Sequence, residues 1–305
     1  MGGFVIGLDG GGTKTEVVVC DLQGNVLSQF KSGAININGE TVTNVESNLK
    51  YIFEKIFSET GPSSECACTC AGAAGISNAL ARETLKAAIV SSGYSGRLII
   101  SGDHQTALHG ALGKDVGIIL IAGTGSICYG RNRHGIEHRT GGFGYLIDDE
   151  GSGYAIGRDM LSAIVRAYDG RGEATALTDM VFSQLKINSV EELIGYIYSK
   201  EINKRDIARL APNLTDACIN GDSAAMAISH KCSDELFKLV KPVVEKLDLY
   251  SGEIAFSGSI LTKDRYIGNT LTEKVSQEFP GLKCVCPKAG AAHGAAMMAL
   301  EAAKQ

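Results

Sequence analysis

Apolar positions along the first third of the chain alternate between the two-residue period of strands and the longer period of helices. Short apolar runs rich in β-branched residues predict strands at 4–6, 16–20 and 26–30. Apolar residues at helical spacing predict an amphipathic helix near residues 41–58. The same two patterns then predict strands at 66–70 and 97–100 and helices at 79–91 and 106–112. We therefore expect a mixed α/β unit in this part of the chain.

The pattern begins again near residue 116. An apolar run at 116–122 is followed by strand-like segments at 127–131 and 136–139, just as two strands follow the first one at 4–6. In both places a glycine-rich turn separates the first two strands. The repetition indicates that one domain has been duplicated. Residues 155–250 are predicted to be helical and contain no motif with recognisable chemistry.

The first glycine-rich turn, Gly10-Gly11-Gly12-Thr13-Lys14, has the composition of a phosphate-binding loop. Glycines let backbone N–H groups approach an anion, and Thr13 and Lys14 add hydroxyl and ammonium donors. The spacing fits neither a P-loop nor a dinucleotide fingerprint, both of which open a helix, whereas a strand follows here. We expect a hairpin that grips phosphate, although a glycine-rich hairpin without a ligand would look the same.

The second turn is Gly123-Thr124-Gly125-Ser126, and two such turns facing each other would clamp a polyphosphate in a cleft. A carboxylate, Asp103, follows the strand at 97–100, where open α/β sheets bind ligands. Asp103 can also cap the helix that follows it, and the two roles are compatible.

Three segments together resemble the N-acetylglucosamine kinases: Gly7 to Thr15, Gly123 to Ser126, and Gly141 to Ser152. These kinases lie in the superfamily of sugar kinases, heat-shock chaperones and actin. Their branch, the BadF/BadG/BcrA/BcrD ATPase family, includes the activating ATPases of benzoyl-CoA reductase. The likeness runs from about Val5 to the C-terminal helix, so it spans nearly the whole chain.

The resemblance implies an α/β fold with two actin-like (ribonuclease H-like) domains and a ligand cleft between them. The first domain would comprise residues 1–114 and 289–305, because in similar kinases the C-terminal helix packs back against it. The second domain would comprise residues 115–288, with the second phosphate turn and the adenosine segment.

The resemblance also implies the reaction. Similar kinases use ATP and Mg²⁺ to phosphorylate the 6-hydroxyl of N-acetylglucosamine or N-acetylmuramic acid, in amino-sugar metabolism and cell-wall recycling, and are often homodimers. By this likeness Asp103 is the general base, and Asp9 holds Mg²⁺ through water. His104 is a weaker candidate for the base, because proximity in sequence need not aim its ring into the cleft.

The remaining contacts follow from the same likeness. The nucleotide contacts that it implies are Gly11, Gly12, Thr13, Lys14, Thr124, Gly125, Ala211 and Gly258. The sugar contacts that it implies are Asn36, Asp103, Ser126, Gly142, Phe143 and Asp149. A strand that merely ends in a tight turn would also explain Gly258, and Asn38, in the Asn36 loop, could cap the next helix. The family position of Phe143 holds a tryptophan, which bears on the shape of the acetamido pocket because this chain has no Trp.

Length and charge agree with this interpretation. The 305 residues leave room for two domains, and 29 basic against 34 acidic residues, a net charge of -5, provide no basic footprint for nucleic acid. No apolar run approaches the roughly 20 residues of a membrane span, and the start of the chain leads into a strand rather than a signal peptide. We therefore expect a cytoplasmic protein without a membrane partner.

The chain contains nine cysteines, which could indicate a metal site. Cys66, Cys68 and Cys70 alternate along one predicted strand, as do Cys284 and Cys286, so each set should share one face of its strand. Zinc sites favour cysteines separated by at least two residues, which makes these positions candidates for the core.

Proteins with several other functions could contain similar motifs. A glucosamine kinase would share them. An activating ATPase would bind an iron–sulfur cluster through a cysteine segment that Cys70 to Gly75 loosely resembles. A sugar-responsive regulator usually has a helix-turn-helix before the first strand, where this sequence has three residues. A sugar-binding protein without activity would not need the chemical groups of Asp9, Thr13, Asp103 and Thr124.

Overall fold

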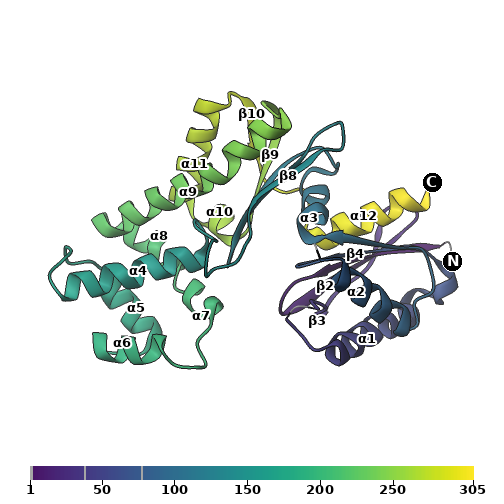
Figure 1. Ribbon diagram of the computed structural model, residues 1–305, viewed down its shortest axis with the longest axis horizontal. Coiled ribbons are helices and arrows are strands. Elements are labelled where there is room, and N and C mark those ends of the chain that lie inside the picture. The colour runs from purple at the N-terminus through teal and green to yellow at the C-terminus, as the bar shows by residue number, and fades with distance from the viewer. Residues whose placement is uncertain (1–2, 38, 77) are drawn as a thin grey trace. The chain divides into compact units, whose positions relative to one another are not determined.

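The computed structural model describes residues 3–37, 39–76 and 78–305. The chain divides into two compact units, of which unit 1 comprises Met1–Asp115 with Pro287–Gln305 and unit 2 comprises Val116–Cys286. Each unit has a five-stranded sheet and a hydrophobic core of its own, so each is described separately (Figure 1).

The sheet of unit 1 combines two hairpins with two parallel strands. Its strands are β1 (Phe4–Gly10), β2 (Lys14–Asp21), β3 (Val26–Gly33), β4 (Cys66–Ala73) and β5 (Leu98–Gly102), in the order β3-β2-β1-β4-β5. β1, β2 and β3 pair antiparallel, whereas β4 pairs parallel with both β1 and β5. The carboxyl ends of β1, β4 and β5 therefore meet at one edge of the sheet.

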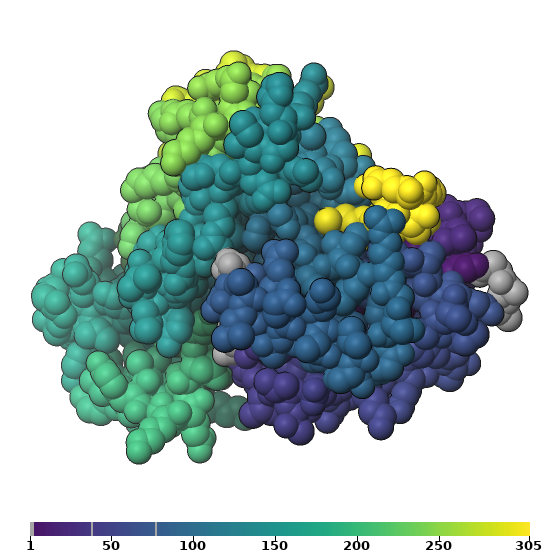
Figure 2. Space-filling model, turned by 45° about the vertical axis from the view of Figure 1, so that its right-hand side comes forward, coloured from purple at the N-terminus to yellow at the C-terminus, as the bar shows by residue number. Residues whose placement is uncertain are grey.

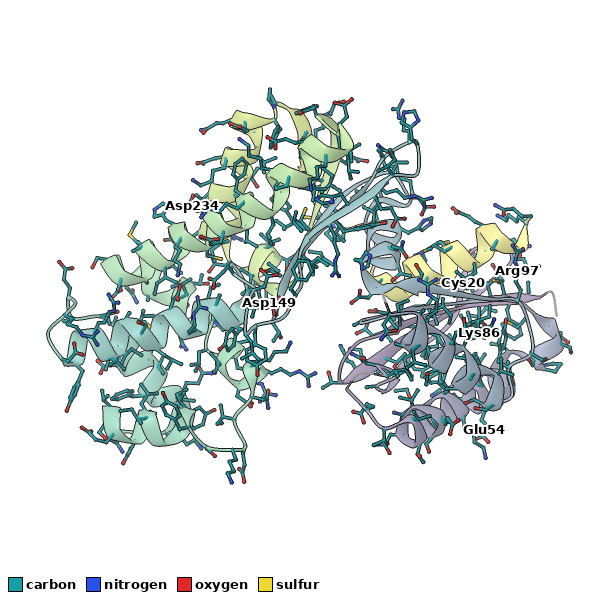
Figure 3. All side chains as sticks on the ribbon, viewed as in Figure 1. Cys20, Glu54, Lys86, Arg97, Asp149 and Asp234 are labelled. Carbon is teal, nitrogen blue, oxygen red and sulfur yellow. The ribbon has the colours of Figure 1, made fainter. Side chains whose placement is uncertain are left out.

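Helices cover both faces of this sheet (Figure 1). Helices α1 (Val42–Thr60) and α2 (Ala79–Ser91) lie on one face, and α12 (Ala291–Ala303) lies on the other, next to α3 (Asp103–Leu112). Figure 3 shows Cys20 on the α12 side and Glu54 and Lys86 on α1 and α2. The N-cap of α1 is Thr41, whose side chain accepts a hydrogen bond from the backbone N–H of Asn44. Asn38, the alternative cap, lies outside the described residues.

Helix α12 crosses β1 at very short range because Gly7 has no side chain. A Cβ at Gly7 would lie 2.2 Å from the carbonyl oxygen of Ala292 and 2.3 Å from the backbone nitrogen of Ala296. The alanines of α12 then pack on Val5 and Val18. Figure 2 shows this yellow helix against the purple and blue surface of the first hundred residues. Gly7 therefore serves packing of the sheet rather than the phosphate turn.

The three cysteines of β4 do not share a face, so that expectation is wrong. Phe4 pairs with Cys66 but Val5 pairs with Cys68, so Ala67 is an extra residue that forms a β-bulge. As a result Cys66 packs in the core beneath α1 and α2, whereas Cys68 and Cys70 pack beneath α12.

Unit 2 repeats the topology of unit 1. Its strands are β6 (Gly117–Ala122), β7 (Ser126–Arg131), β8 (Glu137–Gly141), β9 (Ser251–Ser257) and β10 (Gly281–Val285), in the order β10-β9-β6-β7-β8. The pairing directions correspond strand for strand to those of unit 1. Cys284 lies on β10, but the strand ends at Val285 and Cys286 is exposed, so these two cysteines do not form the expected pair on one strand.

Most of the helices of unit 2 lie between β8 and β9. They are α4 (Gly153–Tyr168), α5 (Leu177–Leu185), α6 (Val190–Ile197), α7 (Lys204–Ala208), α8 (Pro212–Ile219) and α9 (Ser223–Leu247). Helices α10 (Ser259–Lys263) and α11 (Arg265–Glu278) follow β9. Among the helices of the described residues, none combines the length and the apolar character needed to cross a membrane.

Candidate active site

Asp9 and Asp103 lie at the same edge of the sheet of unit 1. Asp9 pairs with Gly72 of β4, Gly72 pairs with Ser101 of β5, and Asp103 follows two residues later as the first residue of α3. The parallel pairing of three strands thus brings together two carboxylates that are far apart in sequence.

The electrostatics of Asp9 show what the pair can bind. Burial, followed by the negative charges of Asp103 and Glu16, raises the pKa of Asp9 to about 6, against the opposing effect of Lys14. Mg²⁺ prefers oxygen ligands and would relieve the repulsion between the two carboxylates. The residues present therefore fit a magnesium ion, with Asp9 as the group that would hold it.

Asp103 does not cap α3, in contrast to the structural role considered above. The N-cap is Gly102, whose backbone N–H donates to the side-chain oxygen of Gln105 at 3.0 Å. Oδ1 of Asp103 instead accepts a hydrogen bond from the backbone N–H of His104 at 2.9 Å. The Asp103 side chain is 44% exposed and lies in the first turn, where a helix favours negative charge.

The first glycine-rich turn joins β1 to β2. The backbone N–H of Gly11 donates to the carbonyl oxygen of Lys14 at 3.0 Å, and Gly12 and Thr13 are exposed. Nζ of Lys14 lies 2.8 Å from Oε1 of Glu16, and this hydrogen bond raises the pKa of Lys14. Residues two apart share a strand face, so Glu16 competes with any phosphate for Lys14. The two-residue spacing of Lys14 and Glu16 along one strand is the signal that could have indicated this ion pair.

The loop with Asn36 is held beside the end of β1. Ile35 is fully buried, and a Cβ at Gly10 would lie 2.5 Å from its Cγ1. Nδ2 of Asn48, on α1, donates to the carbonyl oxygen of Ala34 at 2.8 Å. Asn48 is a supporting residue that sequence reasoning missed, since an asparagine within a helix has no signature of its own.

In unit 2 the turn Gly123–Ser126 is hydrogen-bonded to the segment that leads into α4. The hydroxyl of Ser126 donates to the carbonyl oxygen of Glu150 at 2.7 Å, and its backbone N–H donates to Oδ1 of Asp149 at 3.3 Å. Ser126 and Asp149 are both buried, and burial raises the pKa of Asp149 above its usual value, against the effects of the Ser126 N–H and Lys204. Figure 3 shows Asp149 close to the start of α4. The structure thus joins two of the expected sugar contacts directly.

The loop that follows β8 is different, because most of its large side chains are exposed. Phe143 is 61% exposed, and the guanidinium of Arg139 lies 4.8 Å from the centre of its ring. The backbone N–H of Phe143 donates to Oδ2 of Asp148 at 3.0 Å, and the neighbouring Gly142 has a φ of 74°. Gly142 and Phe143 therefore present backbone and an aromatic face at the surface of unit 2.

A cavity of about 620 Å³ opens beside the second turn, within unit 2. This volume is in the range of small-molecule sites. Thr124 and Ala211, which the sequence analysis assigned to the nucleotide, both line it. Gly258 is not among the lining residues, although its neighbour Ser259 is, and its φ of 89° is a conformation that favours glycine. A Cβ at Gly258 would lie 2.2 Å from the carbonyl oxygen of Ala122, so glycine lets the chain pass β6 on its way to α10.

Three cations line this cavity that the sequence analysis did not identify. Arg205 and Arg209 lie four residues apart at α7, and Lys263 lies on α10. Two arginines at this spacing share one helix face, which is the signal that could have indicated them. The helical region 155–250 therefore does contribute chemical groups to a cavity.

Known proteins are similar to this chain over almost its whole length. Residues 6–299 match the BadF/BadG/BcrA/BcrD ATPase family. The chain belongs to this family. Within the family, it is similar to the N-acetylmuramic acid/N-acetylglucosamine kinase of Clostridium acetobutylicum, with 36% identity over 97% of this chain and 98% of that one.

Two further relatives extend the comparison. The N-acetyl-D-glucosamine kinase of Dictyostelium discoideum is 30% identical over 98% of each chain. A candidate N-acetylglucosamine kinase of Chromobacterium violaceum has the same fold, with a TM-score of 0.78 and 24% identity over 98% of this chain and 99% of that chain. This member of the BadF/BadG/BcrA/BcrD ATPase family therefore has the two-domain actin-like fold that the sequence predicted.

Proposed function

We propose that the protein is an ATP-dependent kinase that phosphorylates the 6-hydroxyl of an N-acetylated amino sugar, N-acetylglucosamine or N-acetylmuramic acid. The observation that carries the proposal is the whole-length similarity to two kinases named for N-acetylglucosamine, one of them also named for N-acetylmuramic acid. The two carboxylates at one edge of the sheet of unit 1, Asp9 and Asp103, supply the chemistry that such a kinase needs.

In the proposed reaction Asp103 accepts the proton of the sugar 6-hydroxyl. The sugar oxygen forms a bond to the γ-phosphorus while the bond from that phosphorus to the β,γ-bridging oxygen breaks, leaving ADP. Asp103 suits this role because its carboxylate is accessible and is not used to cap α3. Mg²⁺ at Asp9 would offset the charge of the phosphates when bound.

Different residues are proposed to bind the nucleotide and the sugar. The cavity of unit 2 is proposed to hold the nucleotide, with Ala211 and Pro212 supplying apolar wall. Its charged lining consists of three cations, Arg205, Arg209 and Lys263, against two carboxylates, Asp216 and Asp264. Gly11, Gly12, Thr13, Lys14, Thr124 and Gly125 are proposed to contact the phosphates. Asn36, Ser126, Gly142, Phe143 and Asp149 are proposed to contact the sugar.

The buried thiols argue against the alternative of an activating ATPase with an iron–sulfur cluster. Cys70 is fully buried beneath α12. It is the cysteine of the segment that loosely resembles the cluster-binding segment of those ATPases. Burial raises the pKa of Cys70 to about 12, and a cluster needs accessible thiolates.

Cytoplasmic location fits the nine free cysteines, because reduced thiols are typical of that compartment. The homodimer implied by the resemblance can be checked by light scattering.

An ATP-consumption assay with Mg²⁺ tests the proposed function. N-acetylglucosamine, N-acetylmuramic acid, N-acetylmannosamine, glucosamine and glucose are compared, and the iron content of the same sample is measured. We expect sugar-dependent ADP release that is fastest with N-acetylated sugars. A preference for glucosamine would support a glucosamine kinase, and sugar-independent hydrolysis with bound iron would support the activating ATPase.

A further inference from the structure

Arg158, on α4 of unit 2, has no part in the reaction described above but pairs with Glu150, which directly follows the proposed sugar contact Asp149. Its Nη1 and Nη2 donate to Oε1 and Oε2 of Glu150, each at 2.9 Å. Such bidentate pairs are specific in geometry as well as strong. The pair fixes the side chain of Glu150 against the first half of α4.

The main chain of Glu150 is what connects this pair to the site. Its carbonyl oxygen accepts the hydroxyl of Ser126 at 2.7 Å. The preceding residue, Asp149, has a φ of 65°, a left-handed conformation that is uncommon for residues other than glycine. Backbone of this kind persists where the surrounding contacts hold it on both sides. Arg158 therefore holds the peptide that orients Ser126 and follows Asp149.

A second carboxylate keeps the guanidinium in place. Oδ1 of Asp159 accepts hydrogen bonds from Nε and Nη2 of Arg158 at 3.3 and 3.2 Å. Oδ2 of Asp159 accepts from Nζ of Lys231, on α9, at 2.7 Å. The Asp159 side chain is only 18% exposed. This network distinguishes Arg158 from an isolated surface pair, which contributes little.

The nucleotide side of the same turn is held by other contacts. The backbone N–H of Gly153 donates to the carbonyl oxygen of Gly123 at 2.7 Å, and that of Tyr154 donates to the carbonyl oxygen of Thr124 at 3.3 Å. These bonds join backbone to backbone and do not involve the guanidinium. Loss of Arg158 should therefore disturb Ser126 and Asp149 more than Thr124.

We propose that Arg158 is a positioning residue for the sugar, acting through Glu150 on Ser126 and Asp149. The inference rests on the proposed function, because it takes Ser126 and Asp149 as sugar contacts. It assigns a role in sugar binding to a side chain that is not itself a proposed sugar contact.

The test compares Arg158→Gln and Arg158→Lys with the wild type. We expect Arg158→Gln to raise the KM for N-acetylglucosamine about tenfold, the order of one lost charge-assisted hydrogen bond, with the KM for ATP within about twofold. Arg158→Lys keeps the charge but not the fork, so it should resemble Arg158→Gln. Titration calorimetry with N-acetylglucosamine alone should show the same loss of affinity. Arg171→Gln is the matched control, because Nε and Nη2 of Arg171 make a comparable fork with Oδ1 and Oδ2 of Asp169, beyond the end of α4.

The outcomes separate the two proposals. A wild type that binds none of the sugars overturns the proposed function, and this inference with it. A wild type that binds sugar while both Arg158 variants bind it equally well overturns the inference alone, as does an equal rise in both KM values. If Arg158→Gln does not fold, Glu150→Gln, which breaks the same fork with a side chain of similar size, replaces it under the same criteria.

Discussion

At the residue scale, the proposed reaction depends on two carboxylates, Asp9 and Asp103, whose surroundings differ. Asp9 is half-buried, and its burial and the nearby negative charges raise its pKa, whereas the Asp103 carboxylate is accessible at the start of a helix. The environments suit a metal-holding group and a base, respectively. Each assignment leads to a separate prediction.

Replacing the base should remove turnover and keep binding. We expect Asp103→Asn to lower kcat by about 100- to 10,000-fold, the usual contribution of a general base, and to change the KM for the sugar only a few-fold. Steady-state kinetics with N-acetylglucosamine measures both constants. Asp248→Asn is the control, since Asp248 lies exposed at the end of α9 in a left-handed conformation that asparagine tolerates. Near-normal turnover in Asp103→Asn would refute the assignment of the base.

Acidity should act on the reaction through Asp9. Because burial and the charge of Asp103 raise its pKa to about 6, Asp9 carries a proton below that pH and is ionised above it. We expect kcat/KM to fall as the pH drops through about 6, and the falling limb to move to lower pH when Mg²⁺ is increased. Profiles between pH 5 and 8 at several Mg²⁺ concentrations measure this. A limb that does not respond to Mg²⁺ would argue against Asp9 as the metal-holding group.

At the element scale, a buried histidine joins α3 to α12. Nδ1 of His109 lies 2.7 Å from Oδ1 of Asp115, and Nε2 lies 3.5 Å from Oε1 of Glu301. Burial lowers the pKa of His109, but the hydrogen bond to Asp115 and the charges of Glu301 and Asp115 outweigh it, so the pKa is raised overall. Protonated His109 thus links two elements of unit 1 through both ring nitrogens.

Stability should therefore decrease as this histidine loses its proton. A group whose pKa is higher in the folded state stabilises the protein fully below its unfolded value of about 6.5, and the contribution is lost as the pH rises through the folded value. We expect the Tm of the wild type to fall more between pH 6 and 8 than that of His109→Gln. His134→Gln, at an exposed turn, should keep the wild-type dependence. Parallel slopes for wild type and His109→Gln would contradict this role.

Element boundaries also show where sequence patterns succeed. The helix predicted at 79–91 is present with those bounds, because its apolar positions and its Asn78 cap are local signals. The prediction that Cys66, Cys68 and Cys70 share one face of their strand was wrong, because the bulge at Ala67 arises from pairing with β1. Strand pairing is a non-local property that alternation in one strand cannot express.

At the scale of the whole molecule, the C-terminal segment completes the unit formed by the start of the chain. Val5, Val18, Cys20, Cys68 and Cys70 lie beneath α12 and would lose their cover without it. Unit 1 therefore depends on residues that follow unit 2 in sequence.

Truncation after Cys286 should expose this face of the sheet. We expect the truncated chain to lose sugar phosphorylation, and its Cys20, Cys68 and Cys70 to react rapidly with a thiol reagent under native conditions. In the intact protein these three are fully buried, whereas Cys286 is exposed. Truncation after Ala303 removes only Lys304 and the terminal Gln305, both exposed, and is the control. Slow thiol reaction in the chain truncated after Cys286 would show that unit 1 does not need α12.

The sequence by itself determined the local elements, the repeated order of three strands, and the two glycine-rich turns, because each depends on residues close together in the chain. It also brought Asp9, Asp103, Thr124 and Ala211 to attention through its resemblance to a kinase family. Only the tertiary structure decided that Arg205, Arg209 and Lys263 line one cavity with Thr124, and that Arg158 holds Glu150. These features depend on which elements pack together and on which side chains then meet. Such contacts join positions whose separation in sequence follows no fixed period.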